Sequence, residues 1–171
     1  MSSQPVQGAD DATPVDSDRF RRACARFATG ITVVTTLDDH QNPHGMTANS
    51  FTSVSLDPPL VLVCVDSRAK ILHTLRKAER IGINVLSEHQ QDISSTFARS
   101  GADRFSGVQW HSGETGVPLL PGALAWLECV LVNNVEAGDH AILIARVNRA
   151  ECHDGRPLLY FSSGYHHLHK E

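Results

Sequence analysis

The sequence predicts a mainly β fold, with an antiparallel sheet closed or split into a barrel and α-helices at its periphery. About six or seven apolar or β-branched segments read as strands, and the hairpin signals Gly138-Asp139 and Asp154-Gly155 connect several of them. Only about three segments have the apolar spacing of a helix. There is no internal repeat, no Gly-x-Gly-x-x-Gly motif and no P-loop, so a Rossmann-type nucleotide site is not expected.

The length of 171 residues fits one domain with a sizeable core. Residues 1–15 are rich in Ser, Gln, Asp, Gly and Pro and are predicted to form a disordered tail, which leaves residues 16–171 as the folded domain. The four cysteines are scattered without a Cys-x-x-Cys pair, so neither a metal site nor a redox dithiol is expected.

Composition excludes several classes of function. The net charge of −4 argues against nucleic-acid binding, which normally requires a basic face. No apolar run is long enough to span a bilayer. The N-terminus is acidic and polar and has no signal-peptide core, so we expect a cytoplasmic location.

Periodicity and capping residues place the individual elements. The predicted helices run from about Asp18 to Thr29 with Gly30 as C′ residue, from Ser67 through the apolar stripe Ile71, Leu72 and Leu75, and from the Ser87/Gln90 capping box to Gly101. The predicted strands are Ile31–Thr36, the polar stretch after His44-Gly45, Leu60–Val65, Ile81–Leu86, Ala123–Val135, His140 to about Ala150, and Leu158–Phe161.

The segment from His44 to Lys70 is predicted to organise the rest of the chain. It opens with a turn marked by His44-Gly45, continues through a run of Thr, Ser and Asn, and breaks at Asp57-Pro58-Pro59. Leu60–Val65 follows as a strand that should be buried on both faces. The side-chain donors and acceptors of the polar run need either water or a flat polar ligand lying on the strand, and composition alone favours water.

The position of Lys70 favours a bound ligand over water. If Ser67 is the N-cap, Lys70 is the third helical residue, where a cation beside the positive end of the helix dipole is unfavourable. A bound anion would remove this conflict, so we interpret Ser67–Lys70 as a phosphate site rather than as a solvated first turn. The Ser-x-x-Lys spacing also occurs in acyl-enzymes, but the companion Ser-Asp-Asn and Lys-Thr-Gly motifs are absent.

Four motifs occur in order: Thr47-Ala48-Asn49-Ser50, Ser53-Val54-Ser55-Leu56-Asp57-Pro58-Pro59, Asp103-Arg104-Phe105 and Gly138-Asp139-His140. Together they make the chain, from about Phe20 to Tyr165, resemble the short flavin reductases, the reductase components of two-component flavin-dependent monooxygenases. The resemblance implies a split β-barrel homodimer that uses NADH to reduce FAD or FMN. The reduced flavin would then diffuse to a separate monooxygenase. Family usage favours FAD over FMN and NADH over NADPH.

The resemblance also implies the residues that bind flavin. Thr47–Ser50 should line the isoalloxazine ring, with Cys64 nearby, and Ser67, Ala69 and Lys70 should surround the flavin phosphate. Ala69 stands where the family often has Ser, which removes one hydroxyl contact to the phosphate.

Further residues are implied on the side where NADH enters. Arg104 and Phe105 resemble the segment that closes over the flavin, His140 resembles the nicotinamide-side histidine, and Tyr165 lies where the C-terminal segment approaches. No catalytic nucleophile or base is expected, because the flavin carries the chemistry and the protein positions the reactants. The histidines at 166, 167 and 169 are expected to be a surface tail.

Two other functions fit the same predicted fold. One is a protein that holds FMN permanently, either as a carrier or as an enzyme similar to pyridoxamine-phosphate oxidase. The other is a β-barrel binding module without catalytic activity. Consumption of NADH with added FAD, FMN or riboflavin separates these functions from a flavin reductase.

Overall fold

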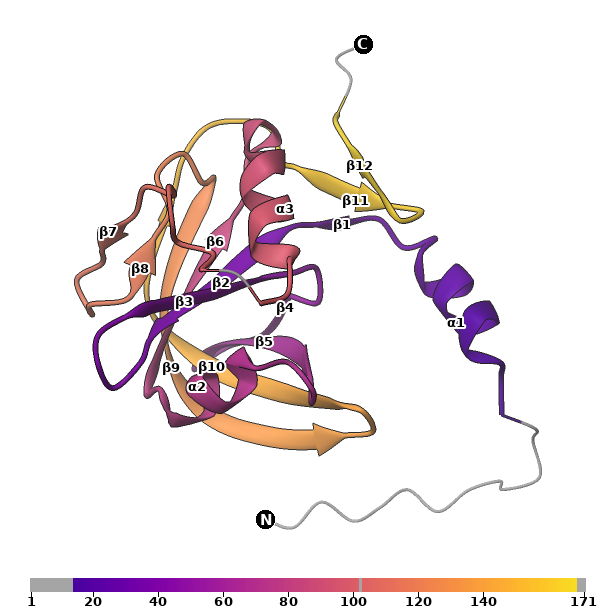
Figure 1. The fold of residues 1–171 in the computed structure, drawn as a ribbon, viewed down its shortest axis with the longest axis horizontal. Coiled ribbons are helices and arrows are strands. Elements are labelled where there is room, and N and C mark those ends of the chain that lie inside the picture. Colours follow the sequence, from indigo (N-terminus) through magenta and orange to yellow (C-terminus); the bar gives the residue numbers. More distant parts are fainter. Residues whose placement is uncertain (1–13, 102, 169–171) are drawn as a thin grey trace.

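A seven-stranded antiparallel sheet forms the body of the protein in the computed structural model, which describes residues 14–101 and 103–168 (Figure 1). The strand order is β3-β2-β6-β9-β10-β5-β4. The edge strands β3 (Pro43–Ala48) and β4 (Thr52–Leu56) are separated in the chain only by residues 49–51, so the sheet curls round and remains open between them. This confirms the predicted mainly β class and the split barrel with peripheral helices.

The remaining elements extend this sheet or cover it. The other strands of the main sheet are β2 (Thr32–Leu37), β5 (Pro59–Asp66), β6 (Arg80–Val85), β9 (Ala125–Ala137) and β10 (His140–Cys152). The helices are α1 (Ser17–Cys24), α2 (Ile71–Lys77) and α3 (Gln91–Ala98), the last preceded by the 3₁₀ turn η1 (Glu88–Gln90). Two small sheets pair β1 (Thr29–Gly30) with β11 (Leu159–Phe161) and β12 (Gly164–His166), and β7 (His111–Ser112) with β8 (Pro118–Leu119).

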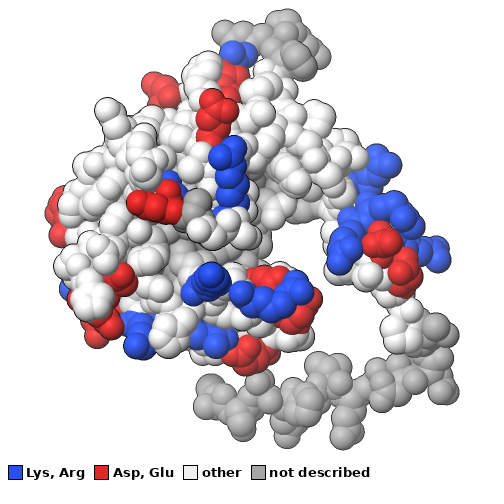
Figure 2. Space-filling view, viewed as in Figure 1, with Lys and Arg blue, Asp and Glu red and all other residues white. Residues whose placement is uncertain are grey.

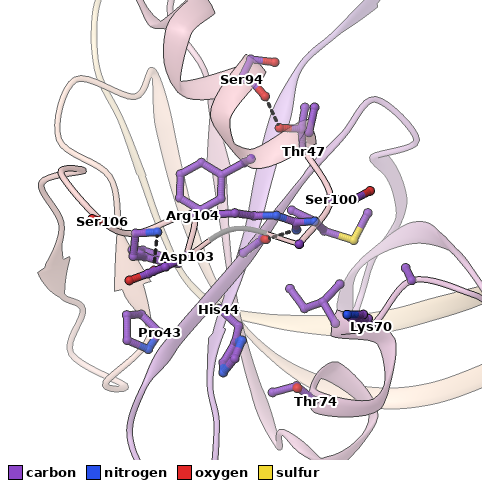
Figure 3. A pocket seen from close by; sticks show the side chains of 18 of the residues that line it. Pro43, His44, Thr47, Lys70, Thr74, Ser94, Ser100, Asp103, Arg104 and Ser106 are labelled. Carbon is purple, nitrogen blue, oxygen red and sulfur yellow. Dashed lines mark hydrogen bonds between the residues drawn. The ribbon is translucent and has the colours of Figure 1, made fainter.

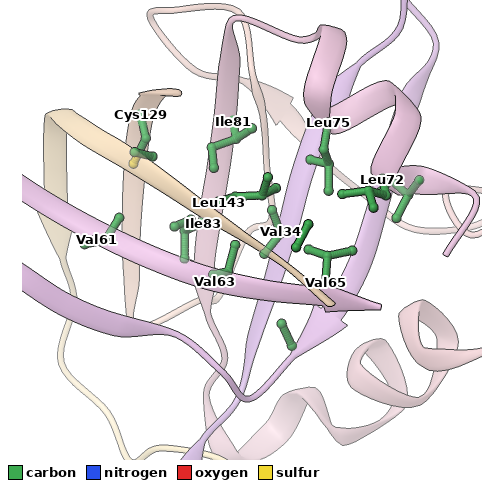
Figure 4. Close-up of a cluster of buried hydrophobic side chains, with 14 residues drawn as sticks. Val34, Val61, Val63, Val65, Leu72, Leu75, Ile81, Ile83, Cys129 and Leu143 are labelled. Carbon is green, nitrogen blue, oxygen red and sulfur yellow. The ribbon is translucent and has the colours of Figure 1, made fainter. Parts of the chain in front are cut away.

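Alternating apolar side chains fill the interior of the barrel. In β5, Val61, Val63 and Val65 are buried, while Leu60 and Leu62 are half-buried on the other face. The prediction that this strand is buried on both faces was therefore wrong, because an antiparallel strand presents only one face to the core. The buried cluster, drawn in Figure 4, consists of Val34, Ala48, Val61, Val63, Val65, Ile71, Leu72, Leu75, Ile81, Ile83, Cys129, Ala141, Leu143 and Ala145.

The β9–β10 hairpin is the longest feature of the sheet. Its two strands pair from Ala125↔Cys152 to Ala137↔His140, and Gly138 at the tip adopts a φ of 64°. The hairpin predicted from Gly138-Asp139 is thus confirmed. The C-terminal segment differs from its prediction: Gly164–His166 pairs with β11 instead of forming only a tail.

The helix α1 is shorter than predicted and packs on nothing within the described chain. Asp16 caps it by accepting the Arg19 N–H at 3.1 Å, but the helix ends at Cys24 and Gly30 belongs to β1. No residue of α1 is buried, and Figure 1 shows the helix standing apart from the barrel.

The start of α2 also differs from its prediction. The helix begins at Ile71 with Lys70 at the N-cap position, where no side chain caps it. Ser67 is not the cap, because it lies three residues before the N-cap position, in a separate turn where Asp66 accepts the N–H groups of Arg68 and Ala69 and the Ser67 N–H donates to the Asp139 carbonyl at 2.9 Å. Lys70 is therefore not a third helical residue, and the predicted conflict with the helix dipole is weaker than expected.

The turn predicted at His44-Gly45 lies earlier in the chain, at residues 38–42. Asp38 accepts the N–H groups of His40 and Asn42, both at 2.9 Å, so the chain reverses at residues 38–42 and His44 and Gly45 lie within β3. The Ser87/Gln90 capping box is confirmed, although it opens the turn η1 rather than α3 directly.

No helix in residues 14–101 and 103–168 is long and apolar enough to cross a membrane. The tail predicted at residues 1–15 lies outside the described residues except at its last two positions, and the histidine at 169 also lies outside them.

Candidate functional site

A cleft of about 1300 Å³ runs along β3 between α2, α3, the segment 100–110 and the C-terminal hairpin (Figure 3). The structure brings these predicted site residues to its wall: Thr47, Asn49, Ala69, Lys70, Arg104, Phe105 and Tyr165. Five others do not line it: Ala48, Ser50, Cys64, Ser67 and His140.

The predicted residues outside the cleft wall have other local partners. Ala48 is 7% exposed and belongs to the barrel core. The Ser50 hydroxyl accepts the Cys64 N–H at 2.9 Å and lies 3.1 Å from the Cys64 carbonyl, so it ties residue 50 to β5. His140 stands at the tip of the β9–β10 hairpin with its Nδ1 2.7 Å from the Asp139 carboxylate. Their roles towards flavin or NADH remain predictions.

A close contact at Gly45 holds the upper wall of the cleft against β3. A Cβ at Gly45 would lie 2.6 Å from Cε1 and 2.8 Å from Cδ1 of Phe97. Phe97 in turn meets Phe105 edge to face, with ring centroids 4.9 Å apart, and both rings are buried. Bare backbone at Gly45 is therefore what allows α3 and residues 103–105 to pack on this strand.

Arg104 crosses the middle of the cleft. Its Nη1 donates to the Gly45 carbonyl at 2.6 Å and its Nε donates to the Arg99 carbonyl at 2.8 Å (Figure 3). Among the described residues no carboxylate pairs with Arg104, and burial lowers the pKa of its guanidinium. The cleft therefore holds a partly desolvated cation that forms no ion pair, because the Asp103 carboxylate, which also lines the cleft, accepts the Phe105 N–H instead; such a cation favours an anionic ligand.

Lys70 supplies a second positive charge to the cleft. It makes no ion pair with any residue in the described part of the chain. In Figure 2, Lys and Arg side chains lie on both sides of the hollow on this face. On a protein of net charge −4, Lys70 and Arg104 are thus two cations without an ion pair in the described chain at one cleft, which suits a phosphorylated ligand.

One buried serine on α3 links two strands that line the cleft, β3 through its carbonyl and β12 through its hydroxyl. The Thr47 hydroxyl donates to the Ser94 carbonyl at 2.7 Å, and the Ser94 hydroxyl lies 2.9 Å from the Tyr165 hydroxyl. Ser94 is fully buried on α3. Because the Thr47 proton is committed to Ser94, the lone pairs of its oxygen are left to accept a hydrogen bond from a ligand.

Sequence reasoning missed several cleft residues: His44, Met46, Ser94, Trp110 and Tyr160. His44 was assigned to a turn, and alternation from Thr47 would not have placed it at the cleft, because residues 44 and 47 point to opposite faces of a regular strand. Ser94 has no signal in the sequence, because its role depends on contacts with residues 47 and 71 positions away.

The sequence model of one protein family, the flavin reductase-like domain, matches residues 24–169 of this chain. The chain belongs to this family. An NADH-dependent flavin reductase from a Rhodococcus species is 43% identical over 162 residues, which cover 92% of this chain and 88% of the relative. A probable flavin reductase from Rhizobium meliloti is 48% identical over 150 residues, which cover 88% of this chain but only 48% of the relative.

Solved structures of flavin reductases share the fold. The NADH:FAD oxidoreductase SgcE6 of Streptomyces globisporus, solved with NAD and FAD fragments, is 38% identical with a TM-score of 0.85, covering 92% of this chain and 98% of that one. The chain spans about half the length of several of the relatives that it matches, the probable flavin reductase of Rhizobium meliloti among them.

The contact at Gly45 gives the first testable prediction. Gly45→Ala forces the new methyl group into Phe97, so we expect the free energy of unfolding to fall by about 1–3 kcal/mol in urea denaturation. Gly30→Ala is the matched control, because nothing lies within 4 Å of a Cβ on that strand glycine. Equal stabilities for Gly45→Ala and the parent would show that Phe97 does not rest on β3.

Proposed function

We propose that this flavin reductase-like protein transfers hydride from NADH to FAD or FMN and releases the reduced flavin to a separate monooxygenase. The observation that carries the proposal is the cleft along β3, where Lys70 and Arg104 have no carboxylate partner among the described residues and Thr47 presents an acceptor in the same cleft. A flavin phosphate fits these cations, and a flat ring with N–H groups fits the polar strand.

The proposed flavin site uses residues from both ends of the segment from His44 to Lys70. Thr47 and Asn49 would contact the isoalloxazine ring, while Lys70 and its neighbour Ala69 would face the phosphate. Arg104 would add a second positive charge between them. Lys70 acts here through its own ammonium group, because α2 is a short helix whose N-terminus contributes little.

Bound flavin would supply the redox chemistry by accepting hydride from NADH. The residues of this chain bind and orient the reactants and exclude water. Phe105 and Trp110, whose ring centroids are 6.0 Å apart, shield one side of the cleft, and the edge-to-face pair Tyr160 and Tyr165 shields the end nearest Thr47. No side chain needs to act as a nucleophile.

The names of several relatives support a separate oxygenase partner. They include the reductase component of a trigonelline monooxygenase, 43% identical, and the reductase component of a 4-nitrophenol monooxygenase, 39% identical. Each denotes a reductase that is one component of a monooxygenase system. We propose the same division of labour for this chain, in the cytoplasm.

We further propose a homodimer. The side chains of Phe20 on α1, Phe27 just after it and Leu56 on the edge strand β4 are 58%, 78% and 96% exposed. An eight-residue helix is not stable alone in water, and an open sheet edge is normally covered. A second copy of the chain would cover both surfaces by symmetry. His140, 44% exposed and outside its own cleft, would then be available to NADH at the cleft of the other copy.

The experiment that tests the function is an NADH oxidation assay with added FAD, FMN or riboflavin. We expect purified protein to be nearly colourless and NADH to be consumed only when flavin is added. Yellow protein that retains FMN through purification and needs no added flavin would contradict the release of reduced flavin. No NADH consumption with any flavin would contradict the proposed reaction itself.

Lys70→Ala separates phosphate binding from ring binding. Loss of a charge-assisted contact should weaken the binding of FAD and FMN by about 1.5–3 kcal/mol and leave the binding of riboflavin unchanged. Lys77→Ala is the matched control, an exposed lysine at the opposite end of the same helix and outside the cleft. The measurement is the dissociation constant of each flavin from fluorescence titration, and equal losses for FAD and riboflavin would place the phosphate elsewhere.

Sedimentation velocity tests the dimer. The parent chain should sediment as a dimer at micromolar concentration, and Phe20→Asp should raise the dimer dissociation constant about tenfold or more, because it removes an apolar side chain from the interface. Leu168→Asp serves as the control, since Leu168 is 48% exposed on the C-terminal segment, far in sequence from α1. A parent chain that is monomeric and fully active would rule out the dimer.

A further inference from the structure

The end of the cleft farthest from Tyr165 has a polar lining of which the proposed flavin site uses only Lys70. Asn42, Pro43 and His44 form it on the side of the β2–β3 turn, and Lys70 and Thr74 form it on the side of α2. Figure 3 shows His44, Thr74 and Lys70 in the same lower part of the cleft, with Thr47 and Ser94 at the other end.

Asp38 fixes the orientation of His44. Its carboxylate accepts the N–H groups of His40 and Asn42 at 2.9 Å and lies 3.0 Å from Nε2 of His44. These hydrogen bonds, the one with His44 foremost, hold the pKa of Asp38 well below its usual range. The carboxylate is therefore ionised and can only accept, so Nε2 of His44 carries a hydrogen and Nδ1 is left for a ligand.

The groups opposite His44 are also left for a ligand. Within the described residues, neither the Thr74 hydroxyl nor the Lys70 ammonium group makes a side-chain hydrogen bond, and Thr74 is half-buried at the cleft wall. An imidazole supported by a carboxylate, a hydroxyl and an ammonium group together suit the oxygens of a phosphate. Asp38 offsets the charge that His44 gains when its Nδ1 is protonated to donate to such an oxygen.

The size of the cleft indicates which phosphate of the ligand would lie at the His44 end. Pockets for a single drug-sized ligand measure about 300–1,000 Å³, and this cleft of about 1300 Å³ continues beyond Lys70 to the β2–β3 turn. If Lys70 holds the phosphate next to the ribityl chain, a mononucleotide leaves the His44 end empty. A dinucleotide has a second phosphate to place there.

We propose that His44, oriented by Asp38, and Thr74 bind the adenylate-side phosphate of a flavin dinucleotide and so make the cleft selective for FAD over FMN. This inference rests on the proposed function. The diphosphate of NADH has the same chemistry, so the test includes a nicotinamide dinucleotide as a separate ligand.

The test compares dissociation constants, measured by calorimetry, for riboflavin, FMN, FAD and NAD⁺. The proteins are the parent chain, His44→Ala, Thr74→Val and the matched control His40→Ala, an exposed histidine of the same turn that does not line the cleft. We expect His44→Ala to weaken FAD about tenfold and to change FMN and riboflavin by less than about twofold. Thr74→Val should also weaken FAD binding, and His40→Ala should leave all four dissociation constants unchanged.

Each other outcome overturns the proposal. Equal weakening of FMN and FAD by His44→Ala would place His44 at the shared phosphate, and unchanged FAD binding would show that it contacts no phosphate. Weakening of NAD⁺ alone would assign this end of the cleft to the nicotinamide dinucleotide. If His44→Ala does not fold, Thr74→Val decides by the same comparison. Failure of the proposed function is distinguishable, because the NADH oxidation assay on the parent chain reports it independently of these dissociation constants.

Discussion

The cleft depends on one close approach, between the backbone of Gly45 and the edge of the Phe97 ring. Because there is no side chain at Gly45, α3 lies directly on β3, and Phe105 packs behind Phe97 to bring residues 103–105 to the same strand. Arg104 completes the contact by donating to the Gly45 carbonyl. A steric constraint at a single residue thus sets the width of the cleft and carries a cation into it.

The electrostatics of the cleft follow from that geometry. Arg104 is held by two backbone carbonyls, which accept its N–H groups but do not neutralise its charge. Lys70 reaches the opposite wall without an ion pair in the described chain. A partly buried cation such as Arg104 is tolerated when an anion completes the site, so the proposed flavin phosphate would offset its charge, whereas Lys70 is exposed and available to the same anion. Family membership and the charge of the cleft therefore support the same proposed ligand by separate arguments.

Local sequence signals predicted the elements whose causes are local. Gly138-Asp139 identified the β9–β10 hairpin and the apolar stripe identified the buried face of α2. The start of α2 was misplaced because Asp66 closes a separate turn over residues 66–69, which the Ser67 N–H joins to the distant Asp139 carbonyl, so the helix begins only at Ile71. In the site, the resemblance located Thr47, Lys70 and Arg104 at the cleft, whereas Ser94 and the orientation of His44 depend on tertiary hydrogen bonds that no spacing encodes.

The most direct measurement of the central claim is a crystal structure of the protein with FAD. The account predicts the isoalloxazine ring against Thr47 and Asn49 and a phosphate within hydrogen-bond distance of Lys70, inside the cleft that Gly45 and Phe97 define. Flavin bound outside this cleft, or bound within it with its phosphate away from both Lys70 and Arg104, would contradict the account.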